Sequence, residues 1–216
     1  MRRAVIFDLD GTLVDSAPGI ARALDRLRAV RGLAPLDIGH ARHWVSLGAA
    51  ILVGKALDRD DAASPGEIAA FRAHYAEDPG APADLYPGIV DALVALKQAG
   101  TTLAVCTNKP QALSERVLSA TGIASHFAAV VGGDAVARAK PDGSHVLHTL
   151  ASMDCNGLPF HFIGDTSVDA AAARASGADF LWASWGYADA ADLDRDGRRL
   201  SSPAELADAI LRTGRA

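Results

Sequence analysis

Residues 5–13 read VIFDLDGTL, and this stretch decides the fold. Its first three residues are β-branched or aromatic, which predicts a buried strand, and Gly11 marks the turn that follows. Asp8 and Asp10 stand two residues apart, so in an extended chain they project to the same side, roughly 6.6 Å apart. Carboxylates this close repel each other, and a bound cation would relieve the repulsion. A simple turn at Asp10 and Gly11 is the alternative explanation.

Further along the chain, short apolar runs alternate with longer stretches of helical periodicity. This alternation is typical of a parallel sheet covered by helices on both faces. The expected strands are Ala4–Asp8, Thr102–Thr107, Ala128–Val131, His161–Gly164 and Asp179–Ala183. The expected helices between and after them are Ile89–Ala99, Pro110–Thr121, Ser144–Ser152, Thr166–Ser176 and Pro203–Leu211. The predicted fold class is therefore α/β, with a Rossmann-like parallel sheet as its core.

The interval between the first and second expected strands is far too long for one crossover helix. The pattern of its middle part predicts three helices, Ala17–Val30, His40–Leu57 and Pro65–Glu77. The stretch Pro79–Pro82 then leads back to the sheet as a hinge. We therefore expect residues 1–15 and 86–216 to form the core and residues 16–85 to form an all-helical insertion.

Composition excludes several classes of function. The chain has 216 residues, and at ~150 residues per domain this suits one domain with a large insertion. Asp and Glu number 26 against 21 for Lys and Arg, and this mild acidic excess argues against a nucleic-acid-binding surface. No apolar run reaches ~18 residues, so no membrane span is expected. The two cysteines make no disulfide framework, and we expect a cytoplasmic protein.

A second acidic pair stands at the end of another expected strand, in GDTSVD at residues 164–169. Asp165 and Asp169 are four residues apart on one helix face, where like charges are unfavourable. Helix capping by Asp165 or Thr166 is the alternative explanation. Because parallel strands end at one edge of the sheet, both acidic pairs can form a single cluster there. A hard cation suits such a cluster, and Mg²⁺ suits it best if it is shared with a phosphate.

Two further strand ends carry groups that suit a phosphate. Thr107, Asn108 and Lys109 place a hydroxyl, an amide and an ammonium before a helix start, whose free N–H groups attract anions. Lys140 followed by Pro141 repeats this arrangement before another helix. Taken singly, Thr107 or Asn108 reads as a cap and a lone lysine as a surface charge. The succession of Asp, Thr, Lys and Asp at four strand ends favours a phosphate site.

On these four motifs, the chain resembles phosphatases of the haloacid-dehalogenase-like (HAD) superfamily, in the phosphoglycolate-phosphatase-like group with a helical cap. The motifs are DLDGT at 8–12, TNK at 107–109, KP at 140–141 and GDTSVD at 164–169, in the family's order. The resemblance covers almost the whole chain, and it implies that the insertion is a mobile cap.

The same resemblance implies a role for each motif residue. Asp8 would be the nucleophile and Asp10 the general acid and base. The phosphate would be bound by Thr107, Asn108 and Lys140, the last also counted as catalytic. The metal residues would be Asp8 through its carboxylate, Asp10 through its backbone carbonyl, Asp165, and Asp169, which would order waters or the lysine.

The function implied is that of a Mg²⁺-dependent phosphatase that hydrolyses a small phosphorylated metabolite through an aspartyl phosphate. 2-Phosphoglycolate leads by resemblance alone, and sugar phosphates, amino-sugar phosphates and nucleotides remain open. A non-catalytic phosphate-binding or regulatory protein on the same fold is the alternative from a different class. No nucleic acid or membrane partner is expected, and both a monomer and a homodimer are open.

The insertion departs from the phosphoglycolate-phosphatase pattern. Ser46-Leu47-Gly48 stands where Gly-Asn-Gly is usual, and Lys55 stands where arginine is common. We expect these four residues to govern substrate specificity, with Lys55 meeting a substrate carboxylate as a point charge. Elsewhere, His145 and His148 have the spacing of a metal pair but no third ligand, so we interpret both as surface histidines.

Overall fold

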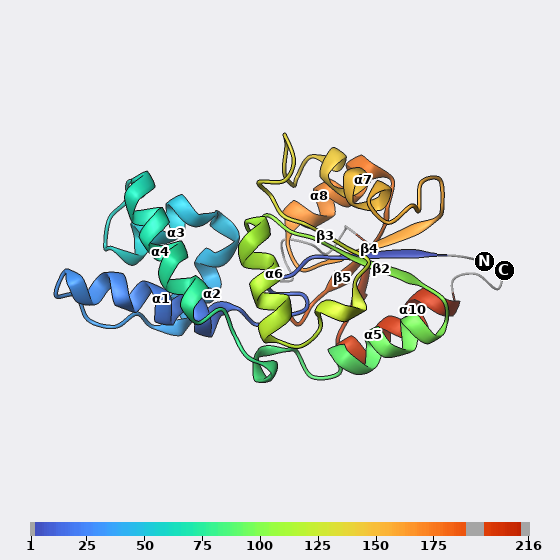
Figure 1. The fold of residues 1–216 in the computed structure, drawn as a ribbon, viewed down its shortest axis with the longest axis horizontal. Coiled ribbons are helices and arrows are strands. Elements are labelled where there is room, and N and C mark those ends of the chain that lie inside the picture. Colours follow the sequence, from blue (N-terminus) through green and yellow to red (C-terminus); the bar gives the residue numbers. More distant parts are fainter. Residues whose placement is uncertain (1–2, 189–196, 213–216) are drawn as a thin grey trace. The chain divides into compact units, whose positions relative to one another are not determined.

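The computed structural model describes residues 3–188 and 197–212, which form two compact units (Figure 1). Ser16–Ala81 make up the helical unit, and the described residues before and after them make up the sheet unit. The sheet unit resumes at Pro82, earlier than the boundary expected from the sequence. The reason is local pairing within the sheet unit, because Leu85 bridges to Val14 and the N–H of Asp15 donates to the carbonyl of Asp84 at 2.8 Å.

The sheet unit is built on a parallel sheet whose strand order is β3-β2-β1-β4-β5-β6. Its described strands are β1 (Ala4–Phe7), β2 (Thr102–Cys106), β3 (Ala129–Val131), β4 (Phe160–Gly164), β5 (Asp179–Ala183) and β6 (Arg198–Leu200). The predicted α/β class with a Rossmann-like parallel sheet is confirmed. The sequence prediction missed β6, because its three residues include two arginines and offer no apolar run.

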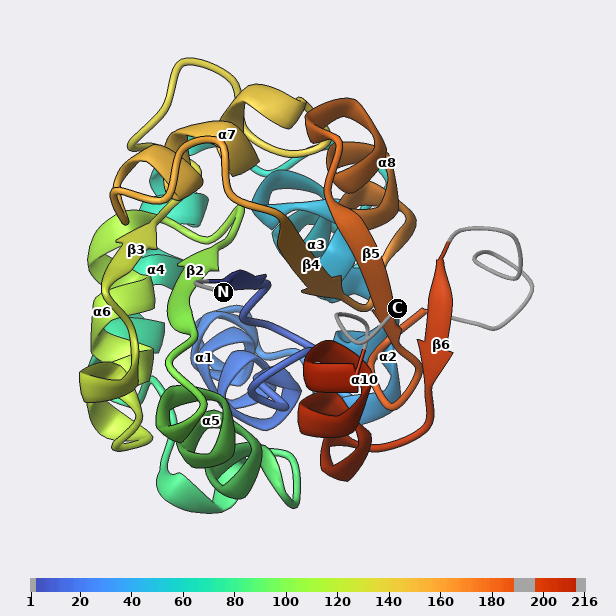
Figure 2. The ribbon, with the colours of Figure 1, turned by 90° about the vertical axis from the view of Figure 1, so that its right-hand side faces the viewer.

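Helices cover both faces of the sheet. Figures 1 and 2 show α7 (Gly143–Ala151) and α8 (Ser167–Ser176) on one face, and α5 (Ile89–Gln98) and α10 (Leu206–Arg212) on the other. Helix α6 (Gln111–Ala120) contacts β3. Short 3₁₀ turns are η2 (Pro82–Asp84), η3 (Ala124–His126) and η4 (Pro203–Glu205). Among the described residues, no helix is both long enough and apolar enough to cross a membrane.

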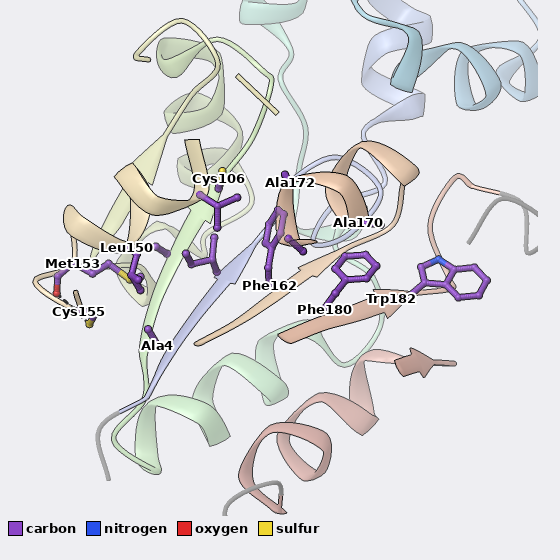
Figure 3. Packing of buried hydrophobic residues seen from close by; sticks show 14 residues of the cluster. Ala4, Cys106, Leu150, Met153, Cys155, Phe162, Ala170, Ala172, Phe180 and Trp182 are labelled. Atoms are coloured by element: carbon purple, nitrogen blue, oxygen red, sulfur yellow. Dashed lines mark hydrogen bonds between the residues drawn. The ribbon is translucent and has the colours of Figure 1, made fainter. Parts of the chain in front are cut away.

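A buried apolar layer joins the sheet to α7 and α8 (Figure 3). Alternate residues of β1, β2, β4 and β5 supply one side of it, as with Phe180 and Trp182 of β5, because side chains two apart in a strand share a face. Helical neighbours such as Val146 and Leu150 supply the other side. Dense packing of this kind resists movement, so the strand ends form a rigid edge on which polar groups can be placed.

The helical unit consists of α1 (Ala17–Val30), α2 (Ile38–Trp44), the 3₁₀ turn η1 (Val45–Leu47), α3 (Ala49–Ala56) and α4 (Pro65–Glu77). The single helix expected over His40–Leu57 is wrong, because the chain breaks at Gly48. That residue has φ +86°, a conformation that a right-handed helix cannot contain. Within the unit α1 packs on α4. An ion pair between Arg22 of α1 and Asp78, the residue after α4, also links these two helices.

Candidate active site

The polar residues singled out in the sequence follow the strands at the carboxyl edge of the sheet. Asp8 comes directly after β1, Thr107 after β2 and Asp165 after β4. Strand β1 lies between β2 and β4. The sheet therefore grows from β1 towards β2 and β3 on one side, and from β4 towards β5 and β6 on the other. Open parallel sheets bind their ligands outside the strand ends at such a point.

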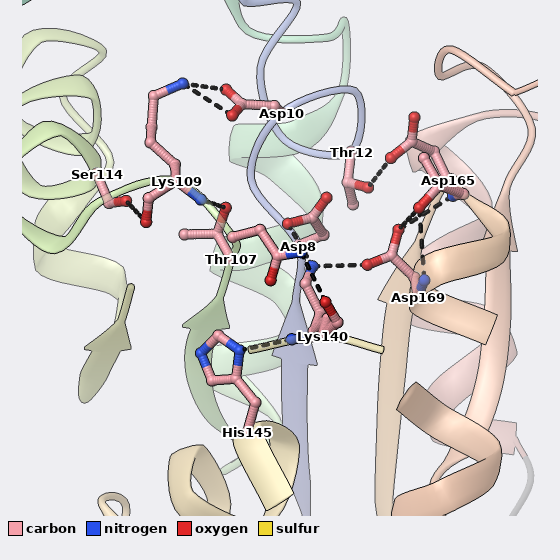
Figure 4. Close-up of polar contacts among 12 residues, drawn as sticks. Asp8, Asp10, Thr12, Thr107, Lys109, Ser114, Lys140, His145, Asp165 and Asp169 are labelled. Carbon is pink, nitrogen blue, oxygen red and sulfur yellow. Dashed lines mark hydrogen bonds and ion pairs between the residues drawn. The ribbon is translucent and has the colours of Figure 1, made fainter. Parts of the chain in front are cut away.

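Lys140 is buried between two carboxylates of this edge (Figure 4). Its Nζ lies 2.7 Å from Oδ1 of Asp8 and 2.6 Å from Oδ1 of Asp169. Burial alone would lower the pKa of Lys140, but the charges of Asp169 and Asp8 outweigh it and raise this pKa above its usual value. Lys140 is therefore an ammonium ion that links the nucleophile expected from the sequence to the helix α8.

Asp8 itself has a perturbed acidity. Burial raises the pKa of its carboxyl group to about 7, and the neighbouring Asp169 charge adds to this rise, while Lys140 opposes it. Burial therefore makes ionisation of Asp8 costly, and a nearby cation favours its charged form. A perturbed carboxyl group at a strand end is typical of a functional site.

Asp165 is completely buried and held by both of its oxygens. Oδ1 accepts the hydroxyl of Thr12 at 3.1 Å, and Oδ2 accepts the backbone N–H of Tyr187 at 2.8 Å. Glycines make room for it, because a Cβ at Gly186 would lie 2.3 Å from the Cβ of Asp165. Burial and the charges of Asp169 and Asp8 raise the pKa of Asp165 well above its usual value.

The two carboxylate oxygens of Asp169 contact different residues. Its Oδ2 accepts the backbone N–H of Thr166 at 3.0 Å, and the Thr166 hydroxyl accepts the N–H of Asp169 in return, so this pair caps α8. Its Oδ1 contacts Lys140. The capping explanation and the site explanation are therefore compatible for this residue, because each uses a different oxygen.

Asp8, Asp165 and Asp169 form a buried cluster that can hold a metal ion. One oxygen from each lies within 4.8 Å of the others. Their charges exceed the single ammonium of Lys140, so a divalent cation would balance the cluster, and purely oxygen ligands fit a hard ion such as Mg²⁺.

The Asp10 carboxylate is not part of this cluster, contrary to the single cluster expected from the sequence. Both of its oxygens contact Lys109 instead.

Thr107 and Asn108, which follow β2, have different hydrogen-bond partners. Thr107 is buried, and its hydroxyl accepts the backbone N–H of Lys109 at 3.2 Å. Asn108, expected to bind phosphate, donates its side-chain amide to the backbone carbonyl of Lys140 at 2.9 Å. Asn108 therefore helps to hold the backbone of Lys140 in place.

His145 corrects the interpretation of the two histidines. His148 is exposed as expected, but His145 is completely buried. Its Nδ1 accepts the backbone N–H of Lys140 at 3.3 Å, and its Nε2 lies 3.2 Å from the carbonyl oxygen of Val131, which fits a neutral ring protonated on Nε2. The helical spacing of His145 with the apolar Val146 and Leu150 is the signal that could have shown it to be buried.

Acidification is expected to remove the stabilising effect of neutral His145. Burial, followed by the charge of Lys140, lowers the pKa of His145 to about 4, against 6.5 for an unperturbed histidine. The unfolded chain therefore binds the proton first, so this contribution is complete above pH 6.5 and declines as the pH falls towards 4. The measurement is the free energy of unfolding in urea across this range for the wild type and for His145→Asn, which keeps an acceptor but cannot titrate.

The difference between the two proteins should shrink towards acidic pH. His148→Asn is the matched control, because its side chain is exposed, and its difference from the wild type should change little. Parallel pH profiles of the wild type and His145→Asn would contradict the prediction.

Comparison with known proteins agrees with this geometry. Residues 2–177 match the model of the haloacid dehalogenase-like hydrolase family. The phosphoglycolate phosphatase of Rhodospirillum rubrum is 42% identical over 196 residues, which cover 87% of this chain and 81% of that protein. A crystal structure of a predicted phosphoglycolate phosphatase from Haemophilus somnus superimposes with a TM-score of 0.80 at 26% identity, covering 95% and 96% of the two chains.

A crystal structure of CbbY from Rhodobacter sphaeroides in complex with xylulose-(1,5)bisphosphate is also similar. Its TM-score is 0.76 at 25% identity, and the match covers 95% of this chain and 96% of that one. The family expected from the four motifs is thus confirmed over most of the sequence. The chain belongs to the haloacid dehalogenase-like hydrolase family.

Proposed function

We propose that this protein is a phosphatase that hydrolyses a small phosphate monoester through a covalent aspartyl phosphate on Asp8. The observation that carries this proposal is the buried Lys140 ammonium, in contact with Asp8 at 2.7 Å and Asp169 at 2.6 Å. An ammonium next to a carboxylate nucleophile suits the approach of a phosphoryl dianion, which would otherwise be repelled. The named relative from R. rubrum supports 2-phosphoglycolate as the first substrate to test.

Mg²⁺ is the proposed cofactor. The residues that would hold it are Asp8, Asp165 and Asp169, together with the backbone carbonyl of Asp10, which the family resemblance implies. When bound, the ion would offset the negative charge of the carboxylates and of the phosphoryl oxygens. The fit of three buried carboxylates to an oxygen-preferring dication supports this assignment.

In the first half of the reaction, an oxygen of Asp8 forms a bond to phosphorus as the ester P–O bond breaks. Asp10 gives its proton to the departing oxygen. In the second half, Asp10 takes a proton from water while the water oxygen bonds to phosphorus and the bond to Asp8 breaks. Lys140 and Thr107 bind the phosphoryl oxygens in both halves.

A panel assay tests this function. Phosphate release is measured from 2-phosphoglycolate, several sugar phosphates and nucleoside monophosphates, with Mg²⁺ and then with a chelator. We expect rapid release from at least one ester with Mg²⁺ and little release in chelator. Absence of hydrolysis across the panel, with phosphate still bound, would favour the non-catalytic alternative.

Replacing Asp165 with asparagine is expected to remove most of the stabilisation that Mg²⁺ gives. Wild-type protein should gain roughly 3 kcal/mol of unfolding free energy at Mg²⁺ about a hundred times Kd. The variant should gain much less, and its stability in chelator should equal or exceed that of the wild type, because one of three repelling buried carboxylates is gone. The measurement is urea unfolding with Mg²⁺ and with chelator, and Asp91→Asn on the exposed face of α5 is the control. An undiminished Mg²⁺ effect in Asp165→Asn would exclude Asp165 as a ligand.

A sugar phosphate is the second candidate substrate. CbbY, crystallised with xylulose-(1,5)bisphosphate, supports it. The groups at the strand ends address only the phosphoryl group, so we assign selectivity to the helical unit. In that unit Leu47 is 42% exposed, and the Lys55 ammonium lies 6.0 Å from the centre of the Trp44 ring.

Substitutions in the helical unit are expected to change substrate ranking. Replacing Ser46, Leu47 or Lys55 by alanine, or Gly48 by alanine in its positive-φ turn, should alter KM several-fold to about a hundredfold for the preferred ester. Small generic esters such as p-nitrophenyl phosphate should change much less. Steady-state kinetics on both substrates test this, with Val30→Ala at an exposed site of α1 as control. Equal losses on both substrates would show that these residues support the fold instead.

A further inference from the structure

Lys109 contacts the carboxylate expected to move protons. Its Nζ lies 2.7 Å from Oδ1 and 2.8 Å from Oδ2 of Asp10 (Figure 4). The side chains of Lys109 and Asp10 are only 7% and 16% exposed. An ion pair so shielded from water is stronger than one on the surface.

The backbone from which this lysine extends is tightly held. The N–H of Lys109 donates to the Thr107 hydroxyl at 3.2 Å, and its carbonyl accepts the N–H of Gly133 at 3.0 Å. A Cβ on Gly132 would lie 2.9 Å from this carbonyl oxygen, so the neighbouring loop is packed closely against it. The Lys109 side chain therefore starts from a defined point and reaches Asp10 in a defined direction.

The two lysines of the site have different partners. Lys140 contacts Asp8 and Asp169, whereas Lys109 contacts both oxygens of Asp10. A carboxyl group rotates freely about its bond to Cβ unless its oxygens are held. Contacts to both oxygens restrict that rotation, which matters for a group that must face a departing oxygen.

We propose that Lys109 is a positioning residue that orients the Asp10 carboxyl group for proton transfer to the leaving group. Asp10 has that task only within the proposed phosphatase mechanism, so this assignment rests on the proposed function. No bond to Lys109 forms or breaks. Its ammonium also balances the negative charge that Asp10 acquires when its proton passes to the leaving oxygen.

The dependence of rate on the leaving group tests this role. Proton donation matters for an alkyl phosphate, whose leaving alkoxide is strongly basic, and hardly matters for p-nitrophenyl phosphate. Lys109→Met should therefore lower kcat/KM for the preferred alkyl phosphate by about tenfold to a hundredfold more than for p-nitrophenyl phosphate. Because kcat/KM includes only the steps up to the first irreversible one, the later attack of water does not enter the comparison.

Three further variants make the test specific. Lys109→Arg should restore most of the loss, because a guanidinium can contact both carboxylate oxygens. The double variant Asp10→Asn/Lys109→Met should be no slower on the alkyl phosphate than Asp10→Asn alone. Lys97→Met is the matched control, since Lys97 is exposed and donates to the carbonyl of Ser125 on the surface, and it should leave both rates unchanged.

Two outcomes would overturn the assignment while leaving the phosphatase mechanism in place. An equal loss on both substrates in Lys109→Met would make Lys109 a phosphoryl ligand, and additive losses in the double variant would show that it acts independently of Asp10. Failure of the wild type to hydrolyse any ester in Mg²⁺ would instead overturn the proposed function, and this assignment with it.

Discussion

Replacing Asp8 with asparagine is expected to lower kcat/KM for every phosphate ester by at least about 10⁴-fold. An amide cannot form the bond to phosphorus, so alkyl and aryl phosphates should lose activity together, unlike in the Lys109 variants. The fold should survive, because asparagine is nearly isosteric and its amide oxygen can still accept from Lys140. Burial raises the pKa of Asp8 to about 7, so the variant also removes a carboxylate that is costly to ionise in the metal-free protein.

The measurements are phosphate release and thermal unfolding of the same samples. Acid-quenched protein should contain a trapped phosphoryl group in the wild type and none in Asp8→Asn. Asp91→Asn, on the exposed face of α5, controls for the loss of one charge. A substantial remaining activity in Asp8→Asn would rule out the covalent mechanism.

Replacing Lys140 with methionine is expected to have the largest effect on stability. The change leaves Asp8, Asp165 and Asp169 buried together without the ammonium that contacts two of them. Breaking a buried ion pair in this way costs about 3–5 kcal/mol of unfolding free energy. Activity should fall by at least about 10³-fold, because the charge proposed to bind the phosphoryl oxygens is lost as well.

The destabilisation should depend on pH and on metal. Burial raises the pKa of Asp8 and of Asp165, so the penalty is complete at alkaline pH and shrinks as the pH falls towards 4, where the unfolded chain is also protonated. Mg²⁺ should recover part of the loss by supplying positive charge.

Urea unfolding at several pH values, with Mg²⁺ and with chelator, measures both effects. The double variant Lys140→Met/Asp169→Asn should recover stability but not activity, because it removes one unpaired carboxylate without restoring the ammonium. Lys97→Met controls for the loss of a lysine at the surface. If Lys140→Met were as stable as the wild type in chelator at alkaline pH, the buried charge cluster would not have the energetic role assigned to it.

Much of this architecture could be predicted from local sequence. The strands β1, β2, β4 and β5 lie where short, mainly apolar runs are followed by a polar residue, because buried parallel strands need apolar side chains on both faces. The four polar motifs reach one edge of the sheet because parallel strands have their carboxyl ends at the same edge. The family followed from their order along the chain.

Other features depend on contacts between distant residues. His145 is buried with its two ring nitrogens against the Lys140 N–H and the Val131 carbonyl, and helical spacing alone does not identify these distant partners. Asn108 donates its side-chain amide to the backbone carbonyl of Lys140, 32 residues further along the chain, a contact that its local sequence does not indicate. Strand β6 is short and arginine-rich, so only its pairing with β5 identifies it.

Asp8 and Asp10 show most clearly which features follow from local sequence and which depend on contacts between distant residues. Sequence alone determined that Asp8 and Asp10 stand at the end of a buried strand, because the apolar run stops there. It predicted that both carboxylates project to one side, which holds only while the chain remains extended. The strand ends at Phe7, and a turn with Gly11 at φ +84° follows, so the alternation of sides no longer applies. Only the tertiary structure decided that Asp8 faces Lys140 while Asp10 faces Lys109, because a side chain beyond a strand takes its direction from the turn and from its distant partners.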